Sequence, residues 1–404
     1  MKKVQTLQDF YDLMLSTIGV RRRLVSNCLN NGGIPAEAVN ALREALNSLQ
    51  AIPQENGAYR VALSQNKTIP LDLSYEINEL RKDIFFLEHD EDEFEGHLGD
   101  IHEDFYLQVK QGVEALQGVC FKAFLTDRDG TVNNYCGRYI SSVQSVYNAV
   151  FLTRFATNAA ENSVVLTSAP LDNIGLVDIS VGPAQVFIYA GSKGREYFNT
   201  EGQRRVFPIE QGKQAKLDAL NARLSALLKQ PEYEMYGLIG SGLQFKFGQT
   251  TVARQDITRS IPKTESEKFL NTVRQLVSSI DPDNVFFRIE DTGLDIEVIL
   301  TVESGEDTES AKDFDKGDGI KFLNQDIGLH MDEGSCLICG DTNSDMPMVA
   351  AAMNIAKETY ATFVTRKDEL KDKVHAVCPS ALFVNEPDVL VTILDKLGKL
   401  RKNE

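Results

Sequence analysis

Residues 121–132, FKAFLTDRDGTV, hold the stretch of sequence that decides the fold. Their apolar run predicts a buried strand that ends at Asp127, and Asp129 follows two residues later. Residues i and i+2 of an extended chain point to the same side, so both carboxylates can face one site at the carboxyl end of the strand. One carboxylate of such a pair can act as a nucleophile while the other moves a proton. Alone, the motif fits a fragment of a calcium loop or an acidic turn equally well.

A second apolar run, SVVLT, ends at Thr167. A hydroxyl group and free backbone N–H groups at the end of a strand can hold phosphate oxygens. Most threonines in such positions only cap the following helix, so this motif is weak by itself.

The segment KDFDKGDGIKFL at 312–323 places Lys316 before two glycines and a predicted helix. An ammonium group there could neutralise both a carboxylate and a phosphoryl group. Lys312 and Lys321 are the competing candidates, and an exposed surface lysine is the plainer interpretation.

The apolar strand of CLICGDTNSDMPM, at 336–348, leads to Asp341 and Asp345. Magnesium prefers a few carboxylates, with water and phosphate in its other positions, so Asp127, one of this acidic pair and the backbone at Asp129 would suffice to bind it. Asp345 would bind the ion through water or hold Lys316, and helix capping is the alternative for the pair. Because strand ends at one edge of a parallel sheet converge in space, the four motifs together predict one site.

The whole chain divides into three regions by its pattern. Residues 1–115 have helical spacing and predict an antiparallel bundle. Residues 116–197 and 313–404 alternate apolar strands with helices, which predicts a doubly wound, Rossmann-like α/β core. Residues 198–312 predict an inserted α+β domain of about four strands and two helices.

The ordered set DRDGT, LTS, DKGDG and GDTNSD resembles the haloacid dehalogenase superfamily. The resemblance implies a magnesium-dependent phosphatase in which Asp127 is the nucleophile and Asp129 the general acid and base. It implies that Thr167 and Lys316 bind the phosphoryl group. It also implies that Asp127, Asp129, Asp341 and Asp345 form the metal site.

Within the superfamily, the sequence is similar to the trehalose-6-phosphate phosphatases, particularly the nematode form with a helical bundle ahead of the catalytic part. The stretches AGSKGREYF, IGSGLQFK and LDIEVIL carry this likeness into the inserted domain, which resembles a cap that selects the substrate. The resemblance implies that cap residues bind the sugar hydroxyls, and the matching candidates are Lys193, Arg195, Glu196, Gln244, Lys246 and Glu297. The stretch LTSAPL departs from relatives that have an arginine after the Thr/Ser, and this sequence has no arginine there to make the corresponding contact.

The expected reaction is therefore hydrolysis of trehalose 6-phosphate. Sucrose phosphate and mannosylglycerate phosphate are alternative substrates, and a regulatory protein acting through the bundle is an alternative of another class. The net charge of −17 argues against nucleic acid as a partner, because phosphate backbones bind basic surfaces. The bundle is a candidate for self-association or for binding a protein partner.

No signal-peptide core or membrane span is expected, and the sparse cysteines favour the cytoplasm. Cys336 and Cys339 form a C-x-x-C, but in a strand they would point to opposite faces and be buried. The acidic stretch at 88–104 contains His89, His97 and His102, and a solvated helix surface is favoured there over a metal site.

Overall fold

The computed structural model describes residues 3–64, 67–301 and 313–402. A mixed sheet forms its centre, in the strand order β15-β14-β13-β4-β5-β6-β7-β8. The bounds are β4 (Phe121–Thr126), β5 (Ala160–Leu166), β6 (Ile188–Gly191), β7 (Glu196–Phe198), β8 (Arg204–Val206), β13 (Ser335–Gly340), β14 (Glu358–Val364) and β15 (Leu382–Val384). Strands β15 to β6 run parallel, and β7 and β8 add antiparallel at one edge. Because β4 lies between β13 and β5, it delivers its aspartates to the middle of the carboxyl edge.

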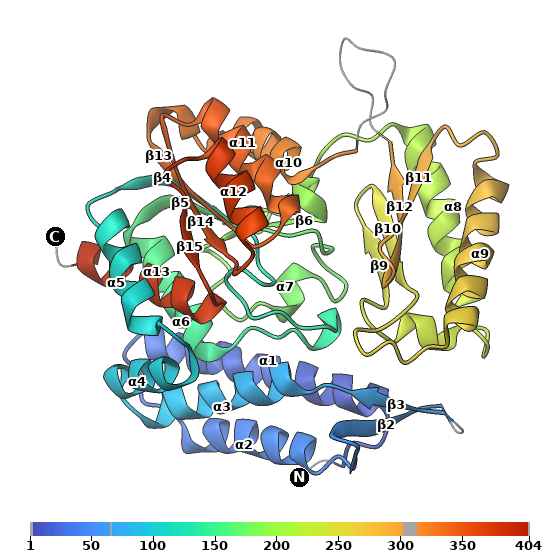
Figure 1. Cartoon of the computed structure of the whole chain (residues 1–404), viewed down its shortest axis with the longest axis horizontal. Helices are drawn as coiled ribbons and strands as arrows, with labels where there is room; N and C mark the ends of the chain where they lie inside the picture. Colours follow the sequence, from blue (N-terminus) through green and yellow to red (C-terminus); the bar gives the residue numbers. More distant parts are fainter. Residues whose placement is uncertain (1–2, 65–66, 302–312, 403–404) are drawn as a thin grey trace.

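Alternate side chains of this sheet enter two separate cores. On β13, Cys336 and Ile338 pack on one side, whereas Leu337 and Cys339 pack on the other. The first side is covered by α10 (Lys316–Leu323), α11 (Met346–Ile355) and α12 (Asp368–Val377), and the second by α6 (Val146–Asn158) and α13 (Pro387–Lys402). Figure 1 shows these helices around the sheet. The prediction of a doubly wound α/β core with two buried strand cysteines is confirmed.

The N-terminal region contains a helical bundle, as predicted. Its helices are α1 (Leu7–Leu29), α2 (Ala36–Gln50), α3 (Ser74–Glu88), α4 (Glu91–Ile101) and α5 (Phe105–Leu116). The prediction of helical spacing throughout is wrong for one part, which forms a small antiparallel sheet of β1 (Gln54–Glu55), β2 (Ala58–Ser64) and β3 (Lys67–Leu71). Asn56 and Gly57, both at positive φ, connect β1 and β2. An Asn-Gly pair is a strong hairpin signal, and it was present in the sequence.

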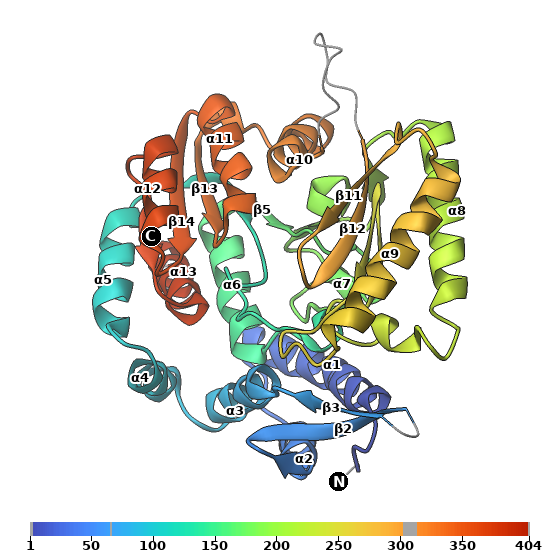
Figure 2. The ribbon, with the colours of Figure 1, turned by 45° about the vertical axis from the view of Figure 1, so that its right-hand side comes forward.

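The inserted domain is a cap with a four-stranded antiparallel sheet in the order β11-β12-β10-β9. Its elements are α8 (Gln211–Leu227), β9 (Leu243–Lys246), β10 (Gln249–Ala253), α9 (Lys263–Ile280), β11 (Phe287–Asp291) and β12 (Asp295–Leu300). Both helices lie on one face of this sheet (Figure 2). The domain limits stay a prediction, and β8 pairs within the core sheet although the sequence-based limit places it in the insertion.

The bundle lies beneath both the core and the cap (Figures 1 and 2). The Tyr11 hydroxyl of α1 donates a hydrogen bond to the carbonyl of Leu238 in the cap, at 2.6 Å. Arg22, also on α1, donates to the carbonyl of Ser180 in the core at 3.0 Å. The bundle is therefore joined to both other regions. In the part of the chain that the structure describes, no helix is long and apolar enough to cross a membrane.

Candidate active site

A buried lysine joins two of the predicted acidic motifs. The Nζ of Lys316 lies 2.5 Å from an oxygen of Asp127 and 2.5 Å from an oxygen of Asp345. All three residues are nearly inaccessible to solvent. Lys316 begins α10 after Asp315, whose side chain caps the helix, so the helix start fixes the direction of the lysine. The two competing lysines do not take this place: Lys321 pairs with Asp318 on the surface, and Lys312 lies outside the described residues.

Asp341 completes a cluster of three carboxylates. Asp127, Asp341 and Asp345 offer oxygen atoms that all lie within 4.8 Å of one another. Burial, together with the charge of Asp345, raises the pKa of Asp127 to about 7, against the lowering effect of Lys316. Burial and the charges of Asp127 and Asp345 raise the pKa of Asp341 to about 8. Crowded, buried carboxylates of this kind suit a divalent cation, whose charge favours their ionised form. The donor set therefore fits a hard metal ion.

Asp345 is already occupied on both oxygens. One oxygen accepts from Lys316, and the other accepts from the backbone N–H groups of Asp341 and Thr342 at 3.0 and 2.9 Å. Burial raises the pKa of Asp345, but Lys316 and these hydrogen bonds outweigh it and leave the pKa below its ordinary value. Of the two roles predicted for Asp345, the geometry favours holding Lys316 and the loop over direct coordination.

Gly130 and Thr131 bring the first and last motifs into contact. The Thr131 hydroxyl lies 3.3 Å from an oxygen of Asp127 and 3.2 Å from an oxygen of Asp341. Gly130 has a φ of +91°, and a Cβ atom there would lie 2.3 Å from the Asp341 carboxylate. The turn after Asp127 therefore needs glycine both for its backbone conformation and for the close approach of Asp341. Sequence reasoning missed Thr131, although it belongs to the DRDGT motif.

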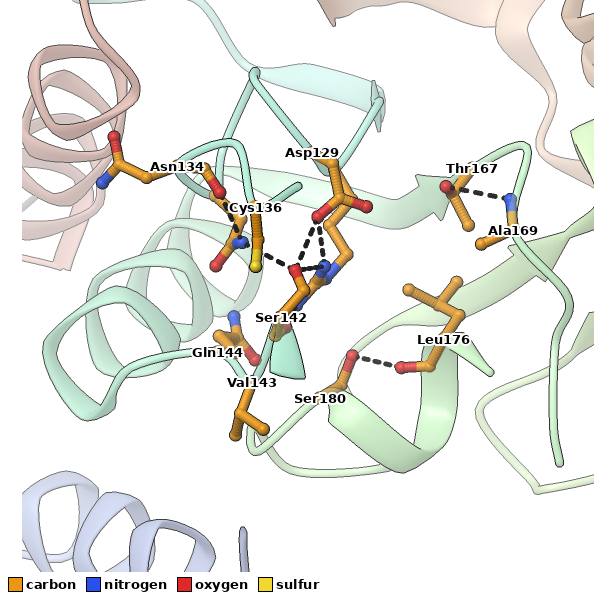
Figure 3. A network of polar contacts seen from close by, with 12 residues as sticks. Asp129, Asn134, Cys136, Ser142, Val143, Gln144, Thr167, Ala169, Leu176 and Ser180 are labelled. Atoms are coloured by element: carbon orange, nitrogen blue, oxygen red, sulfur yellow. Dashed lines mark hydrogen bonds and ion pairs between the residues drawn. The ribbon is translucent and has the colours of Figure 1, made fainter. Parts of the chain in front are cut away.

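Asp129 has contacts that the sequence did not predict (Figure 3). One of its oxygens, Oδ1, accepts from the Ser142 hydroxyl at 2.9 Å and also from the guanidinium of Arg128. Arg128 in turn donates to the hydroxyl of Ser142 at 2.9 Å and to its carbonyl. Arg128 and Ser142 are buried, whereas the Asp129 side chain is 21% exposed. Asp129 is therefore fixed at one oxygen at the edge of the buried cluster.

Thr167 lies directly after β5, the strand beside β4. Its N–H donates to the carbonyl of Ala190 at 2.9 Å, and its hydroxyl accepts from the N–H of Ala169 at 3.3 Å (Figure 3). The carbonyl of Thr167 accepts from the N–H of Lys193 at 2.8 Å. The hydroxyl thus stabilises a local turn, and Thr167 and Lys193 are held together at the carboxyl edge of the sheet. Phosphate binding by Thr167 stays a prediction.

Three of the six candidate sugar ligands share one face of the cap sheet. Gln244 of β9 is paired with Thr251 of β10, which is paired with Glu297 of β12, so the three form a row across the sheet. Lys246 lies two residues after Gln244 and shares its face, with its Nζ 3.9 Å from a Glu297 oxygen. The opposite face carries the apolar residues that pack on α8 and α9. The cap sheet thus has one mainly polar face and one apolar face covered by its own helices.

Charges act between this polar face and the core. Burial lowers the pKa of Lys246 against the raising effect of Glu297 and Asp295, and the positive charge of Lys193 in the core also lowers it. Partial enclosure and the charge of Asp295 in the cap raise the pKa of Tyr135, a residue of the core loop. Asp129 acts on Tyr135 in the same direction. The charges of Asp295 in the cap and of Asp129 in the core thus act on the same tyrosine.

Arg195 and Glu196 instead hold the structure together. The Arg195 guanidinium is buried, donates to the carbonyl of Gly248 at 2.9 Å and stacks over Phe314. Glu196 accepts from the hydroxyl of Ser192 at 2.7 Å and from Arg204 at 2.6 Å. These contacts occupy both side chains at the base of the cap. The prediction that they bind sugar is untested, and their geometry favours a structural role.

The acidic histidine-rich stretch is mostly engaged in packing. His89 and His97 each stack on Phe85, and the His102 ring contacts an oxygen of Asp388 at 2.7 Å. Within the described residues, the side chains with the spacing of metal ligands are the carboxylates of Asp127, Asp341 and Asp345, and not these histidines.

The order of the strand-end motifs and the cap inserted between the second and third define a core of the haloacid dehalogenase type. A family model described as trehalose-6-phosphate phosphatase, C-terminal, matches residues 124–390, and one described as trehalose-6-phosphate phosphatase N-terminal helical bundle domain matches residues 6–104. The chain belongs to the trehalose-6-phosphate phosphatase family.

Similar proteins include longer and equally long chains. An alpha,alpha-trehalose-phosphate synthase [UDP-forming] 2 of Caenorhabditis elegans is 31% identical over 96% of this chain and 33% of its own length. The trehalose-phosphatase of the same organism is 25% identical over 95% of this chain and 94% of its own length. A structure of the C. albicans trehalose-6-phosphate phosphatase C-terminal domain, 13% identical, aligns with a TM-score of 0.46 over 72% of this chain and 96% of that one. The chain thus spans about a third of the length of the synthase relatives it matches.

Proposed function

We propose that this chain hydrolyses the phosphate ester of trehalose 6-phosphate through an aspartyl-phosphate on Asp127. The observation that carries the proposal is the position of Lys316, whose ammonium touches Asp127 inside a cluster of three carboxylates. The alternative interpretation, an isolated acidic turn, does not account for a buried lysine at that place. Family membership supports the same chemistry. This chain covers only about a third of the length of the synthase relatives, so their whole activity is not assigned to it.

In the first step, a carboxylate oxygen of Asp127 attacks phosphorus in line with the departing sugar oxygen. Asp129, two residues later and partly exposed, donates a proton to that oxygen as its bond to phosphorus breaks. The Lys316 ammonium stabilises negative charge on the phosphoryl oxygens, and Thr167 is proposed to hold the same group at the end of β5. The free sugar then leaves.

In the second step, Asp129, now ionised, takes a proton from a water molecule. That water attacks the phosphorus of the acyl phosphate, and Asp127 is released with inorganic phosphate. The same side chain thus acts first as acid and then as base. Ser142 and Arg128 both donate to one oxygen of Asp129, which leaves the other oxygen to exchange the proton.

We propose Mg²⁺ as the bound cation, held by Asp127, Asp341 and the backbone at Asp129, with Asp345 as an indirect ligand. When bound, the ion would neutralise phosphoryl charge and keep Asp127 ionised. The raised pKa values of Asp127 and Asp341 support a cation at this place, because two crowded acids need positive charge to ionise together.

Sugar recognition is proposed for the polar face of the cap. Gln244, Lys246 and Glu297 offer amide, ammonium and carboxylate groups, which form directional hydrogen bonds with neighbouring hydroxyls. Lys193 of the core is proposed to act beside them, because it is bonded to Thr167 at the carboxyl edge of the sheet and its charge acts on Lys246. Arg195 and Glu196 would support this arrangement from the base of the cap.

The test is phosphate release from trehalose 6-phosphate, sucrose phosphate, mannosylglycerate phosphate and glucose 6-phosphate, each measured with added Mg²⁺. Preference for trehalose 6-phosphate together with a phosphorylated Asp127 peptide after acid quenching is the expected result. Comparable kcat/KM values for all four substrates would exclude the trehalose assignment. No release from any of them would favour the regulatory alternative.

The place of action and partners remain parts of the proposal. All six cysteines are free thiols and most are buried, which favours a reducing compartment, and we propose the cytoplasm. Self-association or a protein partner is proposed for surfaces of the bundle that face away from the core.

A further inference from the structure

One loop of the core lies between the bundle and Asp129. It covers residues 133–143, between the DRDGT motif at 127–131 and α6. Its last part carries Ser142, which donates to Asp129. Apart from a single 3₁₀ turn, η1 (Tyr139–Ser141), the loop has no helix or strand, so its path depends on what its side chains contact.

Glu76 of the bundle is the main anchor of this loop. It lies on α3, has no solvent exposure, and accepts from the Ser141 hydroxyl at 2.6 Å. It also accepts from the guanidinium of Arg138 at 3.1 and 3.2 Å through its two oxygens. The thiol of Cys136 points at the same carboxylate, at 3.6 Å. Three side chains of one loop thus converge on a single buried carboxylate.

Tyr75, the residue before Glu76, holds both ends of the loop. Its hydroxyl donates to the carbonyl of Val143 at 3.0 Å and accepts from the side-chain amide of Asn133, also at 3.0 Å. The carbonyl of Asn133 accepts from the N–H of Gly130 at 2.7 Å. Consecutive residues of α3 therefore fix the loop at its start, its middle and its end.

The loop connects Glu76 to Asp129 through two consecutive serines. Ser141 is bound to Glu76, and the next residue, Ser142, is bound to Asp129 and to Arg128. Both serines are buried, so water does not offer an alternative partner. A shift of the loop away from α3 would move the Ser142 hydroxyl and release Asp129 from its position.

We propose that Glu76 of the N-terminal bundle is a positioning residue for Asp129, the acid and base of the catalytic core. The bundle is then a part of the catalytic machinery and not only a spacer or docking module. This inference rests on the proposed function, because it needs a proton-transfer role for Asp129. Proton transfer depends steeply on placement, so a displaced Asp129 lowers the rate even though Asp127 stays intact.

The test is a double-mutant cycle on kcat/KM for trehalose 6-phosphate. Glu76→Gln keeps the shape of the side chain and loses its charge, and Ser142→Ala removes the last link to Asp129. We expect each variant to lose about 10²-fold, within the range for general acid catalysis, and the double variant to lose little more than either alone. A loss in the double variant equal to the product of the single losses would overturn the proposal, and so would unchanged activity of Glu76→Gln.

The matched control is Asp83→Asn. Asp83 is another fully buried carboxylate of α3, and it is paired with Arg21 and with the N–H of Val146 at the start of α6. Combined with Ser142→Ala, it should show additive losses, because it does not act through the loop. If Glu76→Gln does not fold, Ser141→Ala takes its place in the cycle, since it removes the shortest contact of Glu76.

A second substrate separates proton donation from general damage. p-Nitrophenolate leaves without a proton, so kcat/KM for p-nitrophenyl phosphate does not need the acid form of Asp129. Glu76→Gln should keep this value within about threefold while losing activity on the sugar phosphate. Equal losses on both substrates would assign Glu76 a merely structural role. Failure of the proposed function itself would appear separately, as a wild-type protein without turnover of trehalose 6-phosphate.

Discussion

The ammonium group of Lys316 lies 2.5 Å from a carboxylate oxygen of Asp127, although the two residues are 189 positions apart in the chain. The same ammonium lies 2.5 Å from Asp345. One buried positive charge therefore faces three carboxylates, so the cluster around it retains net negative charge when all are ionised. Lys316 is the residue that makes this crowding tolerable in the folded chain.

Replacement of Lys316 by Met should lower kcat for trehalose 6-phosphate by about 10²- to 10³-fold, because a preorganised donor to the transferring group is lost. The measurement is steady-state phosphate release with saturating Mg²⁺. Lys321→Met is the control, since Lys321 is on the same helix but exposed and paired with Asp318. A Lys316→Met enzyme that kept wild-type turnover would contradict the proposed role.

Sequence patterns predicted the strand-end residues because each motif is local. An apolar run followed by Asp127 or Asp341 predicts both a strand and the residue at which the strand ends. The parallel sheet then brings these strand ends together. The same reasoning missed Ser142 and Glu76. Their contacts join segments 13 and 65 residues apart through an irregular loop, and no periodicity encodes such a pairing.

The candidate sugar ligands show the same limit of prediction from sequence. Arg195 and Glu196 have side chains typical of sugar ligands, yet the structure uses them for contacts between backbone segments and neighbouring side chains. Residue type alone does not predict these contacts. The register of β9, β10 and β12 shows which residues share the polar face, and sugar binding by that face stays a proposal.

A methyl group at position 130 should disable the site. In Gly130→Ala the new Cβ would lie 2.3 Å from the Asp341 carboxylate, so Asp341 must move, and we expect kcat/KM to fall at least about 10²-fold. The control is Gly118→Ala, which has a similar positive φ but open space around its Cβ. Both variants should lose about 1–2 kcal/mol of unfolding free energy from backbone strain. Equal activity of the two variants would contradict the role of the close approach.

Removal of one carboxylate should change stability in opposite directions with and without metal. In a chelator at about pH 7.5, near the raised pKa values of the pair, Asp341→Asn should raise the Tm, because it relieves repulsion with Asp127. With Mg²⁺ at about 100 times its Kd, the wild type should gain about 2.7 kcal/mol, and the variant should gain far less. Thermal unfolding in both conditions checks this crossover. An equal gain in both proteins would place the cation elsewhere.

The cap face should affect substrate binding more than chemistry. Lys246→Met removes the ammonium group that is proposed to donate a hydrogen bond to the sugar, and it should raise KM for trehalose 6-phosphate about tenfold or more, with little change in kcat/KM for p-nitrophenyl phosphate. The neighbouring residue Phe245 points to the other side of β9 and is exposed, so Phe245→Ser is the control. The same KM change in the control would show that the strand, and not the ammonium group, matters.

Acid should weaken the contact between the bundle and the C-terminal helix through Asp388. The Lys82 ammonium of α3 lies 2.9 Å from Asp388 of α13, and both residues are buried. Burial raises the pKa of Asp388, but Lys82 and His102 outweigh it and hold the pKa well below its ordinary value. The folded state therefore binds fewer protons at this group than the unfolded state, and its contribution is present above the unfolded pKa of about 3.9 and lost as the pH falls below it.

Asp388→Asn should cost about 3–5 kcal/mol of unfolding free energy at about pH 7, because it leaves a buried ammonium group with one counter-charge fewer. The difference from the wild type should shrink as the pH falls from about 4 to 3, in urea unfolding measured at each pH. Asp395→Asn is the control on the same helix: burial raises the pKa of Asp395, so its difference from the wild type should move in the opposite direction as the pH falls. A constant difference for Asp388→Asn across this range would show that the carboxylate does not stabilise the contact through its charge.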